Sequence, residues 1–424
     1  MLNKEISNAY IDILKEELVP AMGCTEPIAV AYAGALARKT LGELPEAVKL
    51  TVSGNIIKNV KSVIVPHTDG RRGLRTAIAA GICYGNADKK LEVISEATEE
   101  QIKSIDCFLD SAQISVEKSD ANNPFDIQVT LSKGENSAYI RIIDTHTNVV
   151  SIKKNDKALL DKPFSDNVIH TPASRKLLNV KDIVSFADEV EIEEICDVLK
   201  QQIAFNTAIS EAGMNGNYGA GIGKILIRSY GNSVQNRAKA YAAAGSDARM
   251  NGCELPVVIN SGSGNQGITA SIPVIVYAKE CNVSDEMLYR ALIVSNLITI
   301  HLKTDIGSLS AYCGATSAGA GAGAGICYLY GGHYDEIAHT IVNTLAINSG
   351  MLCDGAKASC AAKIASAVEA GLLGMQMYMH DSQFYGGDGL VAKGVENTIK
   401  AVSSVARNGM RETDREIIRF MINE

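Results

Sequence analysis

The residues most capable of chemistry in this chain are its cysteines. Five of the ten lie between residues 281 and 360: Cys281, Cys313, Cys327, Cys353 and Cys360. No C-x-x-C pair occurs, so the patterns typical of zinc ribbons, thioredoxins and ferredoxins are absent. Cys313, Cys353 and Cys360 have small neighbours that would let a bulky inorganic group approach the backbone. Since a buried cysteine is commonly a small apolar packing residue, the spacing leaves both roles open.

Cys24 is a further chemical candidate. It precedes an apolar run that predicts a helix, with Thr25 as its N-cap and Pro27 in its first turn. The positive end of the helix dipole would lower the pKa of the Cys24 thiol and make it a base or nucleophile. An inert packed thiol explains the same pattern equally well.

Two glycine-rich segments resemble nucleotide-binding motifs without completing them. Residues 262–267 fit G-x-G-x-x-G, but Pro273 follows closely and the nearest acid at the required distance, Asp285, begins a helix. Residues 219–224 lack the first glycine and the Ser or Thr of a P-loop. We expect the first segment to offer backbone N–H groups for a carboxylate, together with uncharged side-chain donors. The residues concerned are Ser261, Gly262, Ser263, Asn265 and Gln266.

The loop at residues 66–73 supplies charged candidates. An arginine can bind a carboxylate through two parallel hydrogen bonds, so His67 and Arg71 are predicted to bind substrate. The same composition is also typical of a solvated turn. Lys224 and Lys303 keep pyridoxal phosphate chemistry formally open, although no phosphate-binding segment follows either lysine.

Hydrophobic periodicity predicts the elements that position these side chains. We expect helices over 3–18, 74–84 and 98–109, and strands over 46–60, 91–97, 112–118, 125–132, 137–143 and 149–154. Residues 1–172 are therefore predicted to form an α+β region with a mixed or antiparallel sheet. Residues 173–424 are predicted to form a mainly α-helical domain, in which the Ala-Gly tract 318–325 is a tightly packed helix.

Composition limits the classes of function. The 424 residues are 46% hydrophobic and carry a net charge of −8 without a basic run, which argues against binding to nucleic acid or anionic lipid. Residues 255–278 and 306–334 are uncharged, but their Pro, Gly and polar content indicates buried helices rather than membrane spans. The absence of a signal peptide and the ten cysteines lead us to expect a cytoplasmic protein.

Three sequence features together resemble the L-cysteine desulfidase family. They are Gly23-Cys24-Thr25-Glu26-Pro27, the segment 261–267, and the spacing of Cys313, Cys353 and Cys360. That family in turn resembles the α-domain of iron–sulfur L-serine dehydratases, over roughly the last 250 residues of this chain. The resemblance implies a 4Fe–4S cluster held by the three cysteines, with a fourth iron open to substrate. Cys353 and Cys360 are closer in sequence than the dehydratase ligands, and the chain ends without the dehydratases' cysteine-bearing tail.

The resemblance also implies a reaction. An iron with an open position acts as a Lewis acid, which suits α,β-elimination from an amino acid. We therefore expect conversion of L-cysteine to pyruvate, ammonia and hydrogen sulfide. L-serine dehydration by the same chemistry is the nearest alternative, and a non-enzymatic iron–sulfur or small-molecule-binding regulatory protein is another. A homodimer is expected because the apolar surfaces are rich in Gly and Ala.

Overall fold

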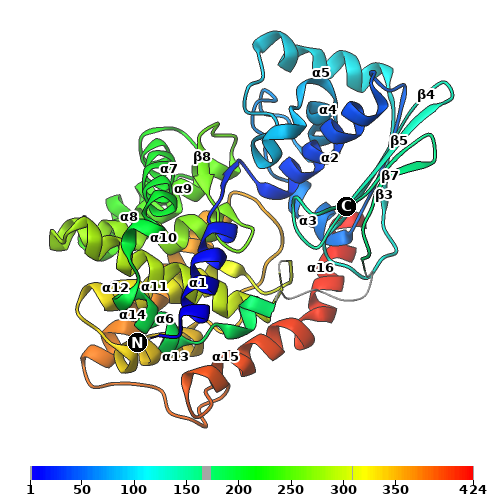
Figure 1. Cartoon of the computed structure of the whole chain (residues 1–424). Coiled ribbons are helices and arrows are strands. Elements are labelled where there is room, and N and C mark those ends of the chain that lie inside the picture. Colours follow the sequence, from blue (N-terminus) through cyan, green and yellow to red (C-terminus); the bar gives the residue numbers. More distant parts are fainter. Residues whose placement is uncertain (1, 165–172, 308, 424) are drawn as a thin grey trace.

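The computed structural model describes residues 2–164, 173–307 and 309–423. An α+β part lies at the upper right of Figure 1 and a helical part at the lower left. The α+β part contains α2 (Thr25–Leu41), β2 (Ala47–Val52), α3 (Gly54–Val60), α4 (Gly73–Tyr84), the 3₁₀ segment η1 (Ala87–Glu92), α5 (Glu99–Ser111), β3 (Gln113–Lys118), β4 (Asp126–Lys133), β5 (Asn136–Ile143), β6 (Val149–Lys154) and β7 (Lys157–Asp161).

The helical part contains most of the remaining elements. They are α1 (Lys4–Glu17), β1 (Pro20–Met22), η2 (Ala173–Leu177), α6 (Val180–Glu189), η3 (Ile192–Glu194), α7 (Cys196–Asn215), α8 (Ile222–Tyr230), α9 (Val234–Met250), β8 (Pro256–Val258), α10 (Gly264–Cys281), α11 (Asp285–Thr304), α12 (Gly314–Leu329), α13 (Tyr334–Ile347), α14 (Cys360–Met379) and α15 (Val395–Ser404). A π-helical turn, η4 (Val405–Gly409), then leads into α16 (Arg411–Asn423).

The larger sheet is mixed, as the sequence predicts. Its strand order is β3-β2-β4-β5-β6-β7, with β2 and β3 parallel and the other neighbours antiparallel. Helix α2 packs on β4 and β5 and contacts α4 on its other side. The buried residues Ile127, Val129 and Leu131 alternate along β4, the pattern of a strand with one face against a core. The predicted α+β class is therefore confirmed.

Two of the predicted strands are wrong in part or entirely. The strand predicted over 46–60 ends at Val52, because Ser53 accepts a hydrogen bond from the N–H of Ile56 and starts α3. The strand predicted over 91–97 is the end of η1 followed by turns, and the side chain of Asn86 caps that segment. Thr25 is the first residue of α2 rather than its N-cap, a position that Cys24 occupies.

The two ends of the chain connect the parts. Strand β1 pairs antiparallel with β8, and the hydroxyl of Tyr10 donates to Leu177 O at 2.9 Å, so the first elements lie with the helical part. At the other end, α16 packs against α3 of the α+β part. The boundary predicted near residue 172 falls outside the described residues and stays a prediction.

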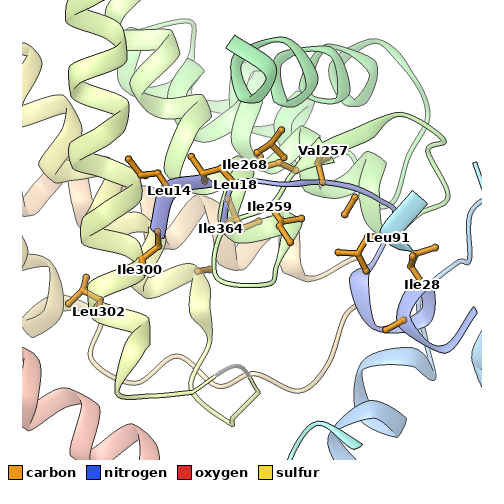
Figure 2. Close-up of a cluster of buried hydrophobic side chains, with 14 of the residues drawn as sticks. Leu14, Leu18, Ile28, Leu91, Val257, Ile259, Ile268, Ile300, Leu302 and Ile364 are labelled. Atoms are coloured by element: carbon orange, nitrogen blue, oxygen red, sulfur yellow. The ribbon is translucent and has the colours of Figure 1, made fainter. Parts of the chain in front are cut away.

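The core continues from one part into the other. Buried apolar residues of both parts belong to one cluster. Figure 2 shows some of them, with Leu14 and Ile300 of the helical part at the left and Ile28 and Leu91 at the right. In the helical part, close backbone contact replaces large side chains: a Cβ added to Gly319 of α12 would lie 2.3 Å from Ala367 O of α14. The Ala-Gly tract is the tightly packed helix that the sequence predicts. Within the described residues, no helix combines the length and apolar character needed to cross a membrane.

Candidate functional site

Two chain segments bring the three candidate cysteine ligands together. The N–H of Cys313 donates to Met351 O at 2.9 Å, and the N–H of Cys353 donates to Ala311 O at 2.7 Å. This short antiparallel bridge places the Cys313 and Cys353 side chains within hydrogen-bonding distance of each other. Cys360 is the first residue of α14, and its thiol lies 3.6 Å from Gly355 O on the same loop.

A small cavity of about 100 Å³ lies in front of these thiols. Seven of the residues predicted for the site line it: Cys24, Ser263, Asn265, Gln266, Cys313, Cys353 and Cys360. The lining combines the α+β part, which supplies Cys24, with loops and helix ends of the helical part. The structure thus brings these seven residues to one cavity, while the roles predicted for them stay predictions.

The other predicted residues do not line this cavity in the described part of the chain. Ser261 and Gly262 form the turn behind it, where Gly262 O accepts a hydrogen bond from Thr25 Oγ1 at 2.9 Å. The Arg71 guanidinium is paired with Asp106, at 3.0 and 2.6 Å. His67 Nδ1 lies 3.3 Å from Glu254 Oε1. Arg71 and His67 of the 66–73 loop therefore contact neighbouring carboxylates rather than the cavity that contains the thiols.

Arg249, which the sequence analysis did not select, takes the place expected for Arg71. It ends the Ala-rich helix α9, is 2% exposed and lines the cavity. Its Nε and Nη2 atoms are buried without a hydrogen-bond partner among the described residues. A Cβ at Gly264 would lie 2.3 Å from Nε, so glycine at that position lets the guanidinium reach the cavity. The available sequence sign was a charged residue inside a run of small apolar ones.

The cavity also contains unpaired acceptors. Asn265 Oδ1 and Gln266 Oε1 are both buried and, within the described residues, neither accepts a hydrogen bond. Buried polar atoms normally have a partner, and unsatisfied ones at a cavity wall indicate a missing ligand. Together with Arg249 they present donors for an anion and acceptors for a cation in one small space.

Cys24 and Glu26 form a buried pair at the opposite wall. The Cys24 thiol donates to Glu26 Oε2 at 3.1 Å, and Asn59 Nδ2 donates to Oε1 at 3.2 Å. Burial, and then the negative charge of Glu26, raise the pKa of Cys24 well above its usual value. The helix dipole does not lower this pKa as expected, because desolvation of the thiolate outweighs it. Glu26 and Asn59 were not predicted from the sequence, because only tertiary packing places them in the cavity lining.

Buried lysines surround the cysteine loops. Lys303 lines the cavity, and burial lowers its pKa to about 8. Lys58 is 1% exposed and donates to the carbonyl of Cys353 at 3.3 Å. The hydrogen bond from Cys313, opposed by burial and assisted by both lysines, lowers the pKa of Cys353 to about 5. The hydrogen bond with Cys353 and burial raise the pKa of Cys313 well above its usual value, and burial raises the pKa of Cys360. Among the three candidate ligands, only the Cys353 thiol therefore lies in surroundings that stabilise its negative charge.

The three thiols fit a cluster in which each would bind a different iron. No three His, Cys, Asp or Glu side chains within 2–164, 173–307 and 309–423 are close enough to share one metal ion. An iron–sulfur cubane binds each thiolate through a different iron, so three thiols around a shared cavity suit it. The bond between Cys313 and Cys353 would give way to two separate iron ligands. Lys58, Lys303 and Arg249 would offset the negative charge of the thiolates.

Comparison with known proteins adds a family to this geometry. The sequence model described as serine dehydratase alpha chain matches residues 88–419. The chain is 57% identical over 415 residues to a UPF0597 protein of Desulfitobacterium hafniense, covering 98% of this chain and 96% of the relative. It is also 39% identical over 422 residues to a UPF0597 protein of Shewanella oneidensis, covering 97% and 98%. The family match includes Arg249 and the three cysteines but begins after Cys24, Glu26 and Asn59.

Proposed function

The chain belongs to the serine dehydratase alpha chain family, and on that premise we propose that it is a lyase that degrades L-cysteine. The products are pyruvate, ammonia and hydrogen sulfide, formed by α,β-elimination and subsequent hydrolysis. The proposal includes a 4Fe–4S cluster held by Cys313, Cys353 and Cys360. It also includes a cytoplasmic location and a homodimer. The mass of the protein in solution tests the homodimer.

The observation that carries this proposal is the set of unpaired groups beside the three thiols. A zwitterionic amino acid has a carboxylate for Arg249 and an ammonium group for Asn265 Oδ1 and Gln266 Oε1. Ser263 adds an uncharged hydroxyl to the same wall. The cavity of about 100 Å³ is small beside typical ligand pockets of roughly 300 Å³ or more, which suits a small substrate.

The residues of this chain divide the work of elimination. Arg249 neutralises the substrate carboxylate, which makes the α-proton more acidic as charge develops. Cys24 is the proposed base: its thiol proton passes to Glu26 Oε2, and its sulfur takes the α-proton. The cluster, when bound, supplies a Lewis-acidic iron for the β-substituent. Hydrosulfide leaves with the electron pair of the Cβ–S bond, and the resulting aminoacrylate takes up water to give pyruvate and ammonia.

L-serine dehydration is the second candidate, because Glu26 places a carboxyl group in the cavity. Expulsion of hydroxide needs a proton donor beside the β-oxygen, whereas hydrosulfide leaves without one. Glu26 accepts hydrogen bonds from Cys24, Thr25 and Asn59, a set of donors that suits an ionised carboxylate. In the proposed mechanism Glu26 is engaged with the Cys24 thiol, so cysteine, whose leaving group needs no acid, is the preferred substrate.

The test is an anaerobic assay of protein reconstituted with iron and sulfide. We expect pyruvate and sulfide in equal amounts from L-cysteine, and much slower pyruvate formation from L-serine at matched concentration. Cys107→Ser is the matched control, because Cys107 is exposed and lies outside the cavity. Faster turnover of serine would reverse the substrate assignment. A bound cluster without turnover of either amino acid would favour the regulatory alternative.

A further inference from the structure

Lys58 of α3 is a buried cation that joins four segments of the chain. Its Nζ atom donates to Asp414 Oδ1 of α16 at 2.6 Å. The same atom donates to Ser310 O and to Cys353 O, both at 3.3 Å. These two carbonyls belong to the segments that carry Cys313 and Cys353. This ammonium group belongs to a residue that is 1% exposed, and it donates one hydrogen bond to a carboxylate and one to each cysteine loop.

The carboxylate that holds Lys58 is itself fixed. Asn55 Nδ2 donates to Asp414 Oδ2 at 2.9 Å, so both oxygens of Asp414 are engaged by α3. The cysteine loop also packs directly on the α3 backbone, because a Cβ at Gly355 would lie 2.2 Å from Lys58 O. Gly355 has φ +93°, a conformation that glycine adopts without strain.

We propose that Lys58, oriented by Asp414 of the C-terminal helix, is a positioning residue for the cysteine site. It holds the Ser310 and Cys353 carbonyls at fixed separation and keeps one positive charge beside the thiols. This role rests on the proposed function only where it concerns a cluster, since the contacts exist among the side chains alone. The C-terminal helix is then part of the site although it contributes no residue to the cavity wall.

The physical reason is the cost of burying a charge. A buried ammonium group is tolerated only when its protons are satisfied, and here the acceptors come from three separate segments. Any movement of α16 or of either cysteine loop would leave a desolvated charge or carbonyl without its partner. The lysine therefore couples the position of α16 to the separation of Cys313 and Cys353.

The first experiment measures hydrogen exchange in the metal-free full chain, so its result does not depend on a cluster. Lys58→Met keeps the length of the side chain and removes the charge and the donors. We expect amides of 310–313 and 351–355 to exchange about tenfold faster, as local opening of these segments becomes easier. Lys61→Met is the matched control, because Lys61 also contacts α16, through Met421 O at 2.7 Å, but touches neither cysteine loop.

The second experiment uses reconstituted protein and reads the cluster spectroscopically. Loss of a nearby positive charge disfavours the reduced, more negative cluster, so Lys58→Met should shift the reduction potential in the negative direction while Lys61→Met leaves it unchanged. If Lys58→Met does not fold, Asp414→Asn replaces it and should give the same exchange pattern. Unchanged exchange in both loops overturns the proposal. If wild-type protein takes up no cluster while the exchange result holds, the proposed function fails and the role of Lys58 stands.

Discussion

The 66–73 loop and the cavity wall each offer an arginine, under opposite electrostatic conditions. Arg71 lies in the loop, has 26% of its side chain exposed and forms two hydrogen bonds with Asp106. Arg249 lies in the wall, is 2% exposed and has two guanidinium nitrogens without a partner in the described residues. A partly exposed arginine that is paired with a carboxylate needs no ligand, whereas a buried arginine without hydrogen-bond partners leaves its donors unsatisfied. We therefore propose the cavity wall, where a buried arginine has unpaired donors, rather than the charged loop, as the substrate site.

The prediction with the largest expected effect tests whether the lining of the cysteine cavity, and not the 66–73 loop, is the reactive centre. Replacing Cys313, Cys353 or Cys360 individually by Ser should abolish both the brown absorbance and the activity, because three ligands leave no redundancy. Absorbance, iron content and pyruvate formation after anaerobic reconstitution are the measurements.

Cysteines away from the wall provide the controls for that test. Cys83, Cys107 and Cys196 lie outside the cavity, and their Ser variants should keep both properties. A chromophore that survives replacement of all three proposed ligands would contradict the cluster assignment and, with it, the importance given to the wall.

The next effect compares the two arginines directly. Arg249→Lys keeps a positive charge but loses the planar pair of donors, and we expect kcat/KM to fall by about a hundredfold, the scale of one lost bidentate charged contact. Arg71→Lys should change kcat/KM by less than about threefold, because its partner is a protein carboxylate on the surface. Steady-state kinetics on L-cysteine make the comparison. Equal losses in the two variants would return the substrate carboxylate to the 66–73 loop.

The sequence predicts the secondary structure best where the pattern is local. Strand β4 alternates along most of its length, β5 and β6 lie where the sequence predicts strands, and the Ala-Gly tract of α12 is a helix as expected. The predicted strand 46–60 fails because a single capping serine, Ser53, converts its second half into a helix. The apolar content of 54–60 is compatible with either structure, and only the cap decides.

The residues of the candidate site also divide into those that the sequence predicts and those that only tertiary contacts reveal. Residue type, small neighbours and the family resemblance are enough to predict Cys313, Cys353 and Cys360 as ligands. Arg249, Glu26 and Asn59 matter because of which partners they have or lack, and those partners come from distant segments. Lys58 is the clearest case, since its acceptors lie more than 250 residues away in sequence. Spacing along the chain contains no information on such contacts.

The smallest expected effect concerns a histidine behind the wall. His146, in the loop between β5 and β6, is buried against Phe125 and contacts the Gly262 turn. Burial lowers the pKa of His146 below its usual value; the negative charge of Glu26 opposes this shift, and the positive charge of Arg249 adds to it. The wall therefore holds a neutral histidine where the unfolded chain would bind a proton.

The consequence for stability follows from the sign of that shift. Below a pH of about 6.5 the unfolded chain takes up a proton that the folded chain resists, so the free energy of unfolding falls as the pH falls through the folded pKa. His146→Gln removes this titration, and its stability should depend less on pH between about 7.5 and 5 than that of the wild type, by at most about 1.4 kcal/mol per pH unit. Urea unfolding at a series of pH values measures the slope. His380→Gln is the control, since His380 is exposed and its replacement should leave the slope unchanged. Identical slopes for the two variants would contradict the prediction, because burial of His146 would then contribute nothing to the pH dependence of stability.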